Sequence, residues 1–371
     1  MLVHYALHQL TDYVNRTFFL FAWNIKPKFA TVADVLATHD CPACREGWIS
    51  GFPEEEQAEA RETLRLYLDA QDRLRRLDEA GIKVHALFRR FPAYSEGDNI
   101  IVTHPDGSTL TLPFLRQQHQ QTDRPNLCLS DFIAPKGYVD ADHVADCLGA
   151  FAVSVDTVPE LDNPDDPYER MLIQVLLDRM AEAATERFHQ DIRTTHWGYA
   201  PHEALTQADL LAERYQGIRP AVGYPSIPDQ SFNFLLRDLI PLDSVGISLT
   251  ENGMMRPHAS VSGLMFAHPA SHYFAIGQVS DEQLSDYARR RGTTLEQIRT
   301  QEMIPLTLLY RLYQLVFIAP FLLLTTFLTA FFTAFGCMLG LSRWFAFTPS
   351  KLWGWTLIRA LFIPVTVEGR H

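Results

Sequence analysis

The stretch Arg219-Pro220-Ala221-Val222-Gly223-Tyr224-Pro225 is the most informative part of this chain of 371 residues. Proline lacks a backbone N–H, and both proline and glycine disfavour the interior of helices and strands, so the stretch predicts an ordered loop. A stiff backbone of this kind would hold the side chains of Arg219 and Tyr224 in fixed directions. The planar guanidinium of an arginine can then grip a small carboxylate through two parallel hydrogen bonds. The stretch therefore predicts a loop that recognises a small charged ligand.

Composition narrows the classes of protein that fit. The chain has a net charge of −12 and a pI near 5.6, which argues against a general nucleic-acid-binding surface. Five cysteines in a chain of this length do not form a disulfide framework. We therefore expect a reducing, cytosolic setting and no nucleic acid as a partner.

Outward from the loop, the pattern of apolar residues predicts helices and antiparallel strands in irregular alternation. This alternation is typical of the α+β class and not of a doubly wound parallel sheet. Ser280 and Gly292 predict the start and end of a short helix. The other predicted helices cover 53–78 and 165–195, and the predicted strands cover 83–91, 99–103, 109–112, 260–266 and 273–279, with a turn at 93–98.

Several segments resemble, in the same order, the activation domain of cobalamin-dependent methionine synthases. Besides 219–225, they are Phe91-Pro92-Ala93-Tyr94-Ser95-Glu96-Gly97-Asp98-Asn99-Ile100, Trp197-Gly198-Tyr199-Ala200-Pro201 and Ala259-Ser260-Val261-Ser262-Gly263. The resemblance spans roughly residues 15 to 300. It implies an antiparallel sheet with flanking helices that binds S-adenosylmethionine and presents it to a cobalamin held by another domain.

The resemblance also implies a set of ligand-binding residues. Arg219 would bind the ligand, and the backbone beside it, including Ala221 and Gly223, would contact the adenine. Glu182 corresponds to a glutamate that meets the ligand's amino group. From the residues alone, Glu182 fits equally a solvated helix position paired with Arg179.

Three further positions follow from the same resemblance. Tyr224 matches a tyrosine that approaches the cobalamin, and Tyr273 matches a second tyrosine of the site, although a strand tyrosine is also typical of a core. Asn15 falls where the family has an aspartate that contacts the ligand. Asparagine can accept a hydrogen bond but carries no negative charge, so this departure is expected to weaken binding of a cation.

A second motif, His39-Asp40-Cys41-Pro42-Ala43-Cys44, contains a Cys-x-x-Cys pair. Such a pair is compatible with half of a zinc site or with a redox pair. No second Cys-x-x-Cys or histidine pair completes four ligands, so the sequence predicts no metal site and two incidental thiols in a loop.

The last part of the chain is different in composition. Leu315 to Leu339 contains no acidic or basic side chain, and as a helix of about 1.5 Å per residue it would span roughly 37 Å, enough to cross a bilayer. We therefore expect two domains, 1–301 and 302–371, the second being a hydrophobic membrane helix or hairpin over about 312–367. The ending Ile363-Pro364-Val365-Thr366-Val367-Glu368-Gly369-Arg370 resembles the N-terminal membrane anchor of 1-acylglycerol-3-phosphate acyltransferases. None of the fourteen histidines has an aspartate five positions on, so the catalytic His-x-x-x-x-Asp motif of those enzymes is absent.

Together these features predict a cytosol-facing activation module, tethered to the membrane, that supports reductive methylation of cob(II)alamin in methionine biosynthesis. The resemblance implies a cobalamin-binding methionine synthase and a flavodoxin-type electron donor as partners, with no turnover by the module alone. Two alternatives remain at this point: a lysophosphatidate acyltransferase remnant, and an S-adenosylmethionine-binding scaffold or sensor.

Overall fold

The computed structural model of the protein describes residues 1–118, 125–138, 146–158 and 166–301, together with 326–327, 330–331 and 334–335. Contacts along the chain divide it into two units, Met1–Gln301 and Glu302–His371. The first unit contains the sheet and all of the named helices and strands.

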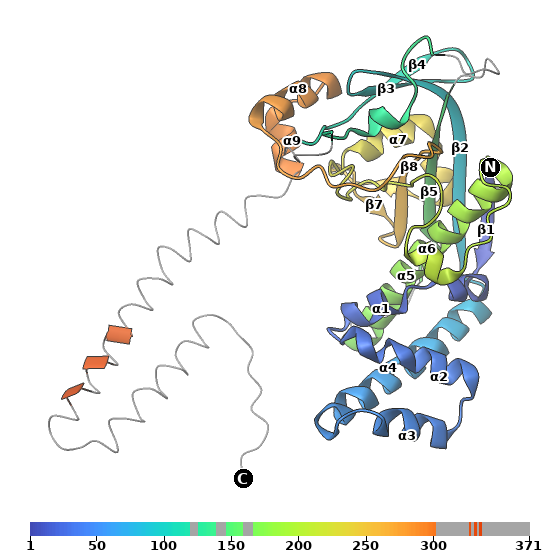
Figure 1. The fold of residues 1–371 in the computed structure, drawn as a ribbon, viewed down its shortest axis with the longest axis vertical. Helices are drawn as coiled ribbons and strands as arrows, with labels where there is room; N and C mark the ends of the chain where they lie inside the picture. The colour runs from blue at the N-terminus through green and yellow to red at the C-terminus, as the bar shows by residue number, and fades with distance from the viewer. Residues whose placement is uncertain are drawn as a thin grey trace. The chain divides into compact units, whose positions relative to one another are not determined.

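The first unit is built on an antiparallel sheet of six strands (Figure 1). Five strands follow the order β4-β3-β2-β5-β8, and β1 pairs with β2. The strands are β1 (Leu2–Ala6), β2 (Lys83–Glu96), β3 (Asn99–Thr103), β4 (Thr109–Pro113), β5 (Cys147–Val155) and β8 (Ser260–Met265). A separate small sheet pairs β6 (Ser248–Leu249) with β7 (Met255–Arg256).

Strand β2 is longer than its sequence predicts. Because β2 continues to Glu96, the turn expected over 93–98 is confined to residues 97–98. Pro92 lies at the last pair of the β2–β5 ladder, and pairing with β3 begins at Ala93. The proline therefore falls where the strand changes neighbours and does not end the strand.

Helix α5 (Pro167–Asp191) packs across one face of the sheet. Asp166 caps it by accepting hydrogen bonds from the backbone N–H groups of Tyr168 and Glu169, and Pro167 occupies the first turn, as the sequence predicts. Its buried apolar residues recur every three or four positions and join β2 and β5 in one core. They include Ile173, Leu177, Met180, Ala184 and Phe188. A single π-helical turn, Ile192–His196, continues the helix.

The opposite face of the sheet carries a second core, to which α7 (Phe232–Leu239) and the short 3-10 helices Leu129–Phe132 and Leu242–Val245 contribute. A third, separate core lies among α1 to α4 and the start of α5. Figure 1 shows these four helices gathered as a layer of their own beyond the end of the sheet. They are α1 (Arg16–Ala22), α2 (Val32–Thr38), α3 (Pro42–Ser50) and α4 (Gln57–Glu79), with 3-10 turns at Leu7–Tyr13, Pro27–Thr31 and Glu54–Glu56.

The remaining helices are α6 (Gln207–Leu211), α8 (Asp281–Arg291) and α9 (Leu295–Gln301). Ser280 caps α8 and Gly292 ends it with a left-handed φ of 66°, as the sequence predicts. The α+β class with an antiparallel sheet and flanking helices is confirmed. The strand predicted over 273–279 is wrong, because this segment bonds to a loop and not to the sheet: Ile276 N–H donates to Pro225 O at 3.0 Å, and Phe274 O accepts from Ser226 Oγ.

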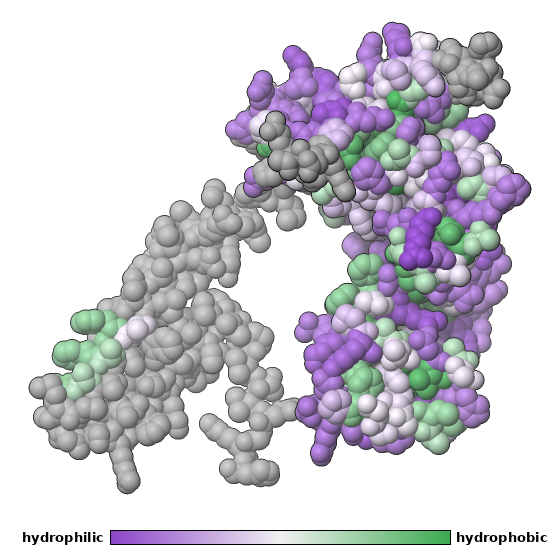
Figure 2. Space-filling model, viewed as in Figure 1, coloured by the Kyte–Doolittle hydropathy of each residue, from purple (hydrophilic) through white to green (hydrophobic). Residues whose placement is uncertain are grey.

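Most of the predicted membrane segment, 312–367, and the acyltransferase-like ending lie outside the described residues. Among the residues that the structure does describe, no helix is both long and apolar enough to cross a membrane. Figure 2 shows that the visible face of the first unit is mostly hydrophilic, with apolar residues in small scattered groups.

Candidate functional site

The predicted recognition loop lies along the outer edge of β8. Ile218 and Phe266 exchange backbone hydrogen bonds of 3.0 and 2.9 Å, and Leu264 N–H donates to Pro220 O at 3.0 Å. The approach is so close that a Cβ at Gly263 would meet Pro220 O at 2.2 Å. Glycine at this position therefore lets the loop bond to the sheet edge, which fixes the loop's backbone.

The second half of the loop turns back on itself. Gly223 has a φ of 86°, a conformation that favours glycine, and its N–H donates to Ile227 O at 2.8 Å. This turn leaves the next side chain, Tyr224, about half exposed. The loop is thus ordered, as predicted, and presents an aromatic ring at the surface.

Arg219 is the centre of a polar cluster, which we call the Arg219 cluster: Arg219, Glu186, Tyr215 and Tyr273. One guanidinium nitrogen, Nη2, donates to Glu186 Oε2 at 2.5 Å, and Nη1 donates to the Tyr215 hydroxyl at 2.8 Å. The backbone N–H of Arg219 donates to the Tyr273 hydroxyl at 3.0 Å. Burial alone would lower the pKa of Arg219, but the neighbouring Tyr273 and Glu186 raise it above its usual value. The arginine is therefore a fixed positive charge, held in place from the loop, α5 and the 271–280 segment.

Glu186 has unused bonding capacity. Its Oε2 binds Arg219, while its Oε1 is buried without a hydrogen-bond partner among the described residues. A buried carboxylate oxygen without a partner is costly, and a ligand's N–H group would satisfy it. Glu186 is not among the ligand-binding residues predicted from the sequence. The signal was present, because Glu186 follows Glu182 by four residues on the same face of a predicted helix.

A cavity of about 180 Å³ lies between α5, the recognition loop and the start of β8. Its lining adjoins the cluster along the chain, since Glu182 lies one helical turn before Glu186 and Ala221 lies two residues after Arg219. Its lining includes Arg179 and Glu182 from α5, and Ala221, Val222 and Tyr224 from the loop. The remaining lining residues are Asp178, Ala181, Met255, His258, Ala259, Ser260 and Val261.

Charged groups in this cavity influence one another. Burial raises the pKa of Glu182, while Arg179, which donates to Glu182 Oε2 at 2.7 Å, opposes the rise. Burial, followed by the negative charge of Glu182, also raises the pKa of Tyr224. Arg219 contributes to both shifts, so the cluster and the cavity are electrostatically connected.

The structure brings together most of the residues selected from the sequence. Glu182, Ala221 and Tyr224 line the cavity, and Arg219 and Tyr273 belong to the adjoining cluster. Gly223 shapes the loop turn and does not line the cavity in the part of the chain described.

Asn15 is placed differently. Its side-chain oxygen accepts a hydrogen bond from the Phe18 backbone N–H at 3.2 Å and caps α1. It is not among the described residues that line the cavity. Its contact with a ligand stays a prediction.

The fold and the site define an α+β module with a partly buried cavity at a sheet edge, lined by both charged and apolar side chains. Over residues 6–292 the sequence matches the family described as vitamin B12 dependent methionine synthase, activation domain. A solved structure described as the MetH reactivation domain bound to AdoHcy is 33% identical, with a TM-score of 0.67; the match covers 81% of this chain and 88% of that chain. The chain therefore belongs to the family of methionine synthase activation domains. The family match ends at residue 292, so it gives no support to the acyltransferase-like ending.

Proposed function

We propose that this protein binds S-adenosylmethionine at the cavity and the Arg219 cluster, and so supports reactivation of a cobalamin-dependent methionine synthase. The observation that carries the proposal is the buried Arg219–Glu186 pair, which has an unsatisfied carboxylate oxygen and adjoins a cavity. The structurally similar MetH reactivation domain binds AdoHcy, a ligand with the same amino-acid and adenosine groups.

The residues present fit such a ligand. An amino-acid group carries one carboxylate and one ammonium, and Arg219 and Glu186 offer opposite charges held side by side. Glu182 adds a second carboxylate at the cavity wall, one helical turn before Glu186. The backbone of Ala221, fixed by the β8 edge, would border the adenine.

The charge and the exposure of the site also fit. Two carboxylates, those of Asp178 and Glu182, and one guanidinium, that of Arg179, line the cavity. This excess of negative charge favours a positively charged ligand. When bound, S-adenosylmethionine supplies the methyl group for the cobalamin of the partner protein. Tyr224, half exposed beside the cavity, offers an aromatic face toward that partner. This chain's part is to bind and orient, while the chemistry belongs to the cofactors.

We further propose the remaining partners and the location. A cobalamin-binding methionine synthase would carry the corrin, and a flavodoxin-type donor would supply the electron. The first unit would lie in the cytoplasm, tethered to the membrane by residues 302–371. The apolar run from Leu315 to Leu339 is the sequence feature that supports the tether.

A calorimetric titration of the full chain with S-adenosylmethionine tests the proposal. We expect saturable binding to the natural chain, and none detectable for Arg219→Ala. Arg237→Ala, which removes an exposed arginine on α7, should bind as the natural chain does. Circular dichroism would establish that each variant is folded. Unchanged affinity in a folded Arg219→Ala variant would remove the cluster from the site.

The same preparation tests reactivation. A methionine synthase that lacks its own activation domain, trapped in the cob(II) state, should regain activity on addition of this chain, S-adenosylmethionine and reduced flavodoxin. Binding without recovery of activity would favour the scaffold or sensor function instead.

A further inference from the structure

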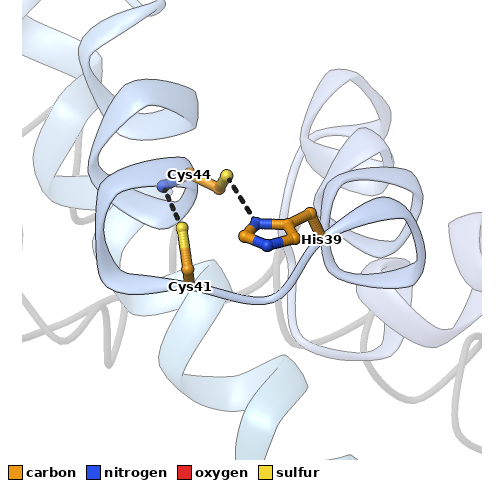
Figure 3. Close-up of side chains that lie close together, drawn as sticks. All are labelled: His39, Cys41 and Cys44. Carbon is orange, nitrogen blue, oxygen red and sulfur yellow. Dashed lines mark hydrogen bonds between the residues drawn. The ribbon is translucent and has the colours of Figure 1, made fainter.

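A second group of chemically active side chains lies in the helical layer, in the connection between α2 and α3 (Figure 3). His39 ends α2, Cys41 is the N-cap of α3, and Cys44 lies in the first turn of α3. Figure 3 shows the thiol of Cys44 and the imidazole of His39 directed toward each other from neighbouring helices, with Cys41 below.

The donor atoms of these residues are close enough to share one ion. His39 Nδ1 and Cys44 Sγ are 3.4 Å apart, and all three donor atoms lie within 4.8 Å of one another. In a tetrahedral zinc site with the usual bond lengths, neighbouring donors are about 3.5–3.8 Å apart. The His39–Cys44 pair already has this separation, and small side-chain rotations would bring in Cys41.

The backbone prepares Cys41 to act as a thiolate ligand. Its Sγ accepts a hydrogen bond from the Cys44 backbone N–H at 3.2 Å, at the positive end of the nine-residue helix α3. An incidental surface thiol would not have this environment.

The connection is also held firmly in shape. Arg45 binds both carboxylate oxygens of Asp40, at 2.6 and 2.7 Å, across the intervening turn. Trp48 Nε1 donates to Thr31 Oγ1 at 3.0 Å, which ties α3 to the start of α2. Because Arg45 occupies the Asp40 carboxylate, the candidate ligands are one imidazole and two thiols, and the described residues contribute no fourth.

We propose that His39, Cys41 and Cys44 bind one zinc ion, with the fourth coordination position open to water or to a thiol or imidazole from a partner. Zinc suits a set of one nitrogen and two sulfur donors, and two thiolates balance its double charge. The sequence predicts two incidental thiols because no second Cys-x-x-Cys or histidine pair completes a set of four ligands at standard spacings. The structure supplies the third ligand, since the turn after α2 brings His39 back beside Cys44. This site is separate from the S-adenosylmethionine site and does not depend on it.

Cobalt substitution tests the site directly. The full chain, reduced and freed of metal with a chelator, would be titrated with Co²⁺ alone. We expect one Co²⁺ per chain, with a thiolate-to-cobalt charge-transfer band and the strong d–d bands of a tetrahedral ion, and displacement of both by one equivalent of Zn²⁺.

Variants assign the ligands. Cys41→Ser is the sharpest, because serine is itself a good N-cap and should preserve α3 while removing the thiolate. It and Cys44→Ser should each lower the intensity of the charge-transfer band by about half, because one thiolate remains, and weaken Zn²⁺ binding by about 100-fold. His39→Ala should keep the thiolate band with reduced affinity. Cys147→Ser, which removes a thiol on β5, should behave as the natural chain.

Two results would overturn the proposal. One is a folded natural chain that binds no Co²⁺ or Zn²⁺ when reduced, or whose cobalt bands and affinity are unchanged by Cys41→Ser. The other is a chain that forms a reversible Cys41–Cys44 disulfide in air and has no affinity for either metal when reduced, which would assign the motif to thiol–disulfide chemistry.

Discussion

Two arginine–glutamate pairs lie near the Tyr215 ring, and they differ in how completely their carboxylates are bonded. The guanidinium carbon of Arg193 lies 4.3 Å from the ring centroid, and that of Arg219 lies 5.9 Å away. Arg193 pairs with Glu203, and Arg219 pairs with Glu186.

The carboxylate of the Arg193 pair is closed, because both of its oxygens are bonded, although Nη1 of Arg193 is buried without a hydrogen-bond partner among the described residues. Nε and Nη2 of Arg193 donate to both oxygens of Glu203, at 2.8 and 2.6 Å, and the two side chains are 0% and 6% exposed. The Arg219 pair is open, because only one oxygen of Glu186 is used and the other has no partner in the part of the chain that the structure describes. A closed pair has no carboxylate oxygen left for a ligand and can only fix the structure. An open pair beside a cavity retains the capacity to recognise one.

The largest effect expected from this comparison is on stability. Arg193→Ala would leave Glu203 buried without its partner and should lower the free energy of unfolding by about 3–5 kcal/mol. Urea denaturation of the full chain measures this loss. The affinity of the folded fraction for S-adenosylmethionine should remain near that of the natural chain.

Glu203→Gln provides a second variant in case Arg193→Ala does not fold, since it keeps the shape of the pair and removes one charge. If either variant retained full stability, the Arg193 pair would not be the structural member of the comparison.

The next effect is on binding. Arg219→Lys keeps the positive charge but loses the planar fork, so it should weaken S-adenosylmethionine binding by about 3 kcal/mol, on the order of 100-fold. The stability should change less than for Arg193→Ala, because lysine can still pair with Glu186. Calorimetry gives the affinity, and urea denaturation gives the stability. An Arg219→Lys variant that binds normally would mean that charge alone suffices and that the fork is not used.

This contrast between the pairs also marks the limit of prediction from the sequence. The proline and glycine content of 219–225 was enough to predict an ordered loop, and the periodicity and caps of α5 and α8 were enough to predict those helices. The sequence places Glu186 one helical turn after Glu182, but it does not show that Glu203 uses both carboxylate oxygens on an arginine while Glu186 uses one. Their difference arises from tertiary contacts that join α5, the loop and the 271–280 segment.

The wrong strand prediction over 273–279 also results from tertiary contacts that the local sequence does not encode. Residues 273–279 have the composition of a strand, but their hydrogen bonds go to Pro225 and Ser226, which no local pattern encodes. Asn15 matches a family position by sequence and its side-chain oxygen caps α1, so its contact with a ligand stays a prediction. Several ordered motifs coincide at the candidate site residues, whereas the position of His39 beside Cys44 depends on a turn between two helices.

A smaller effect distinguishes the two glutamates of α5. Glu186→Gln removes the charge from the open pair and should weaken S-adenosylmethionine binding by about 2 kcal/mol, roughly thirtyfold. Glu182→Gln should cost less, because Glu182 is already bonded to Arg179 and burial has raised its pKa. Calorimetry on both variants decides the order. The reverse order would make Glu182 the group that binds the ammonium, as the family resemblance alone implies.

The smallest effect concerns His189, which lies between the two pairs with its ring 5.1 Å from that of Tyr215. Burial, and then the charges of Arg193 and Arg219, hold its pKa well below the usual value of 6.5. In the unfolded chain His189 gains a proton below about pH 6.5, while in the folded chain it does not, so stability is present above that pH and is lost as the pH falls. From this residue alone, the free energy of unfolding should be about 1.4 kcal/mol lower at pH 5.5 than at pH 7.5.

The comparison of the natural chain with His189→Gln isolates this contribution, because the other titrating groups are common to both. Urea denaturation at several pH values should give a shallower dependence for His189→Gln below pH 6.5, by about 1.4 kcal/mol per pH unit. Parallel pH profiles would mean that His189 takes up its proton at the same pH in the folded and the unfolded chain, so that the carboxylates of Glu186 and Glu203 offset both its burial and the two guanidinium charges that they pair with.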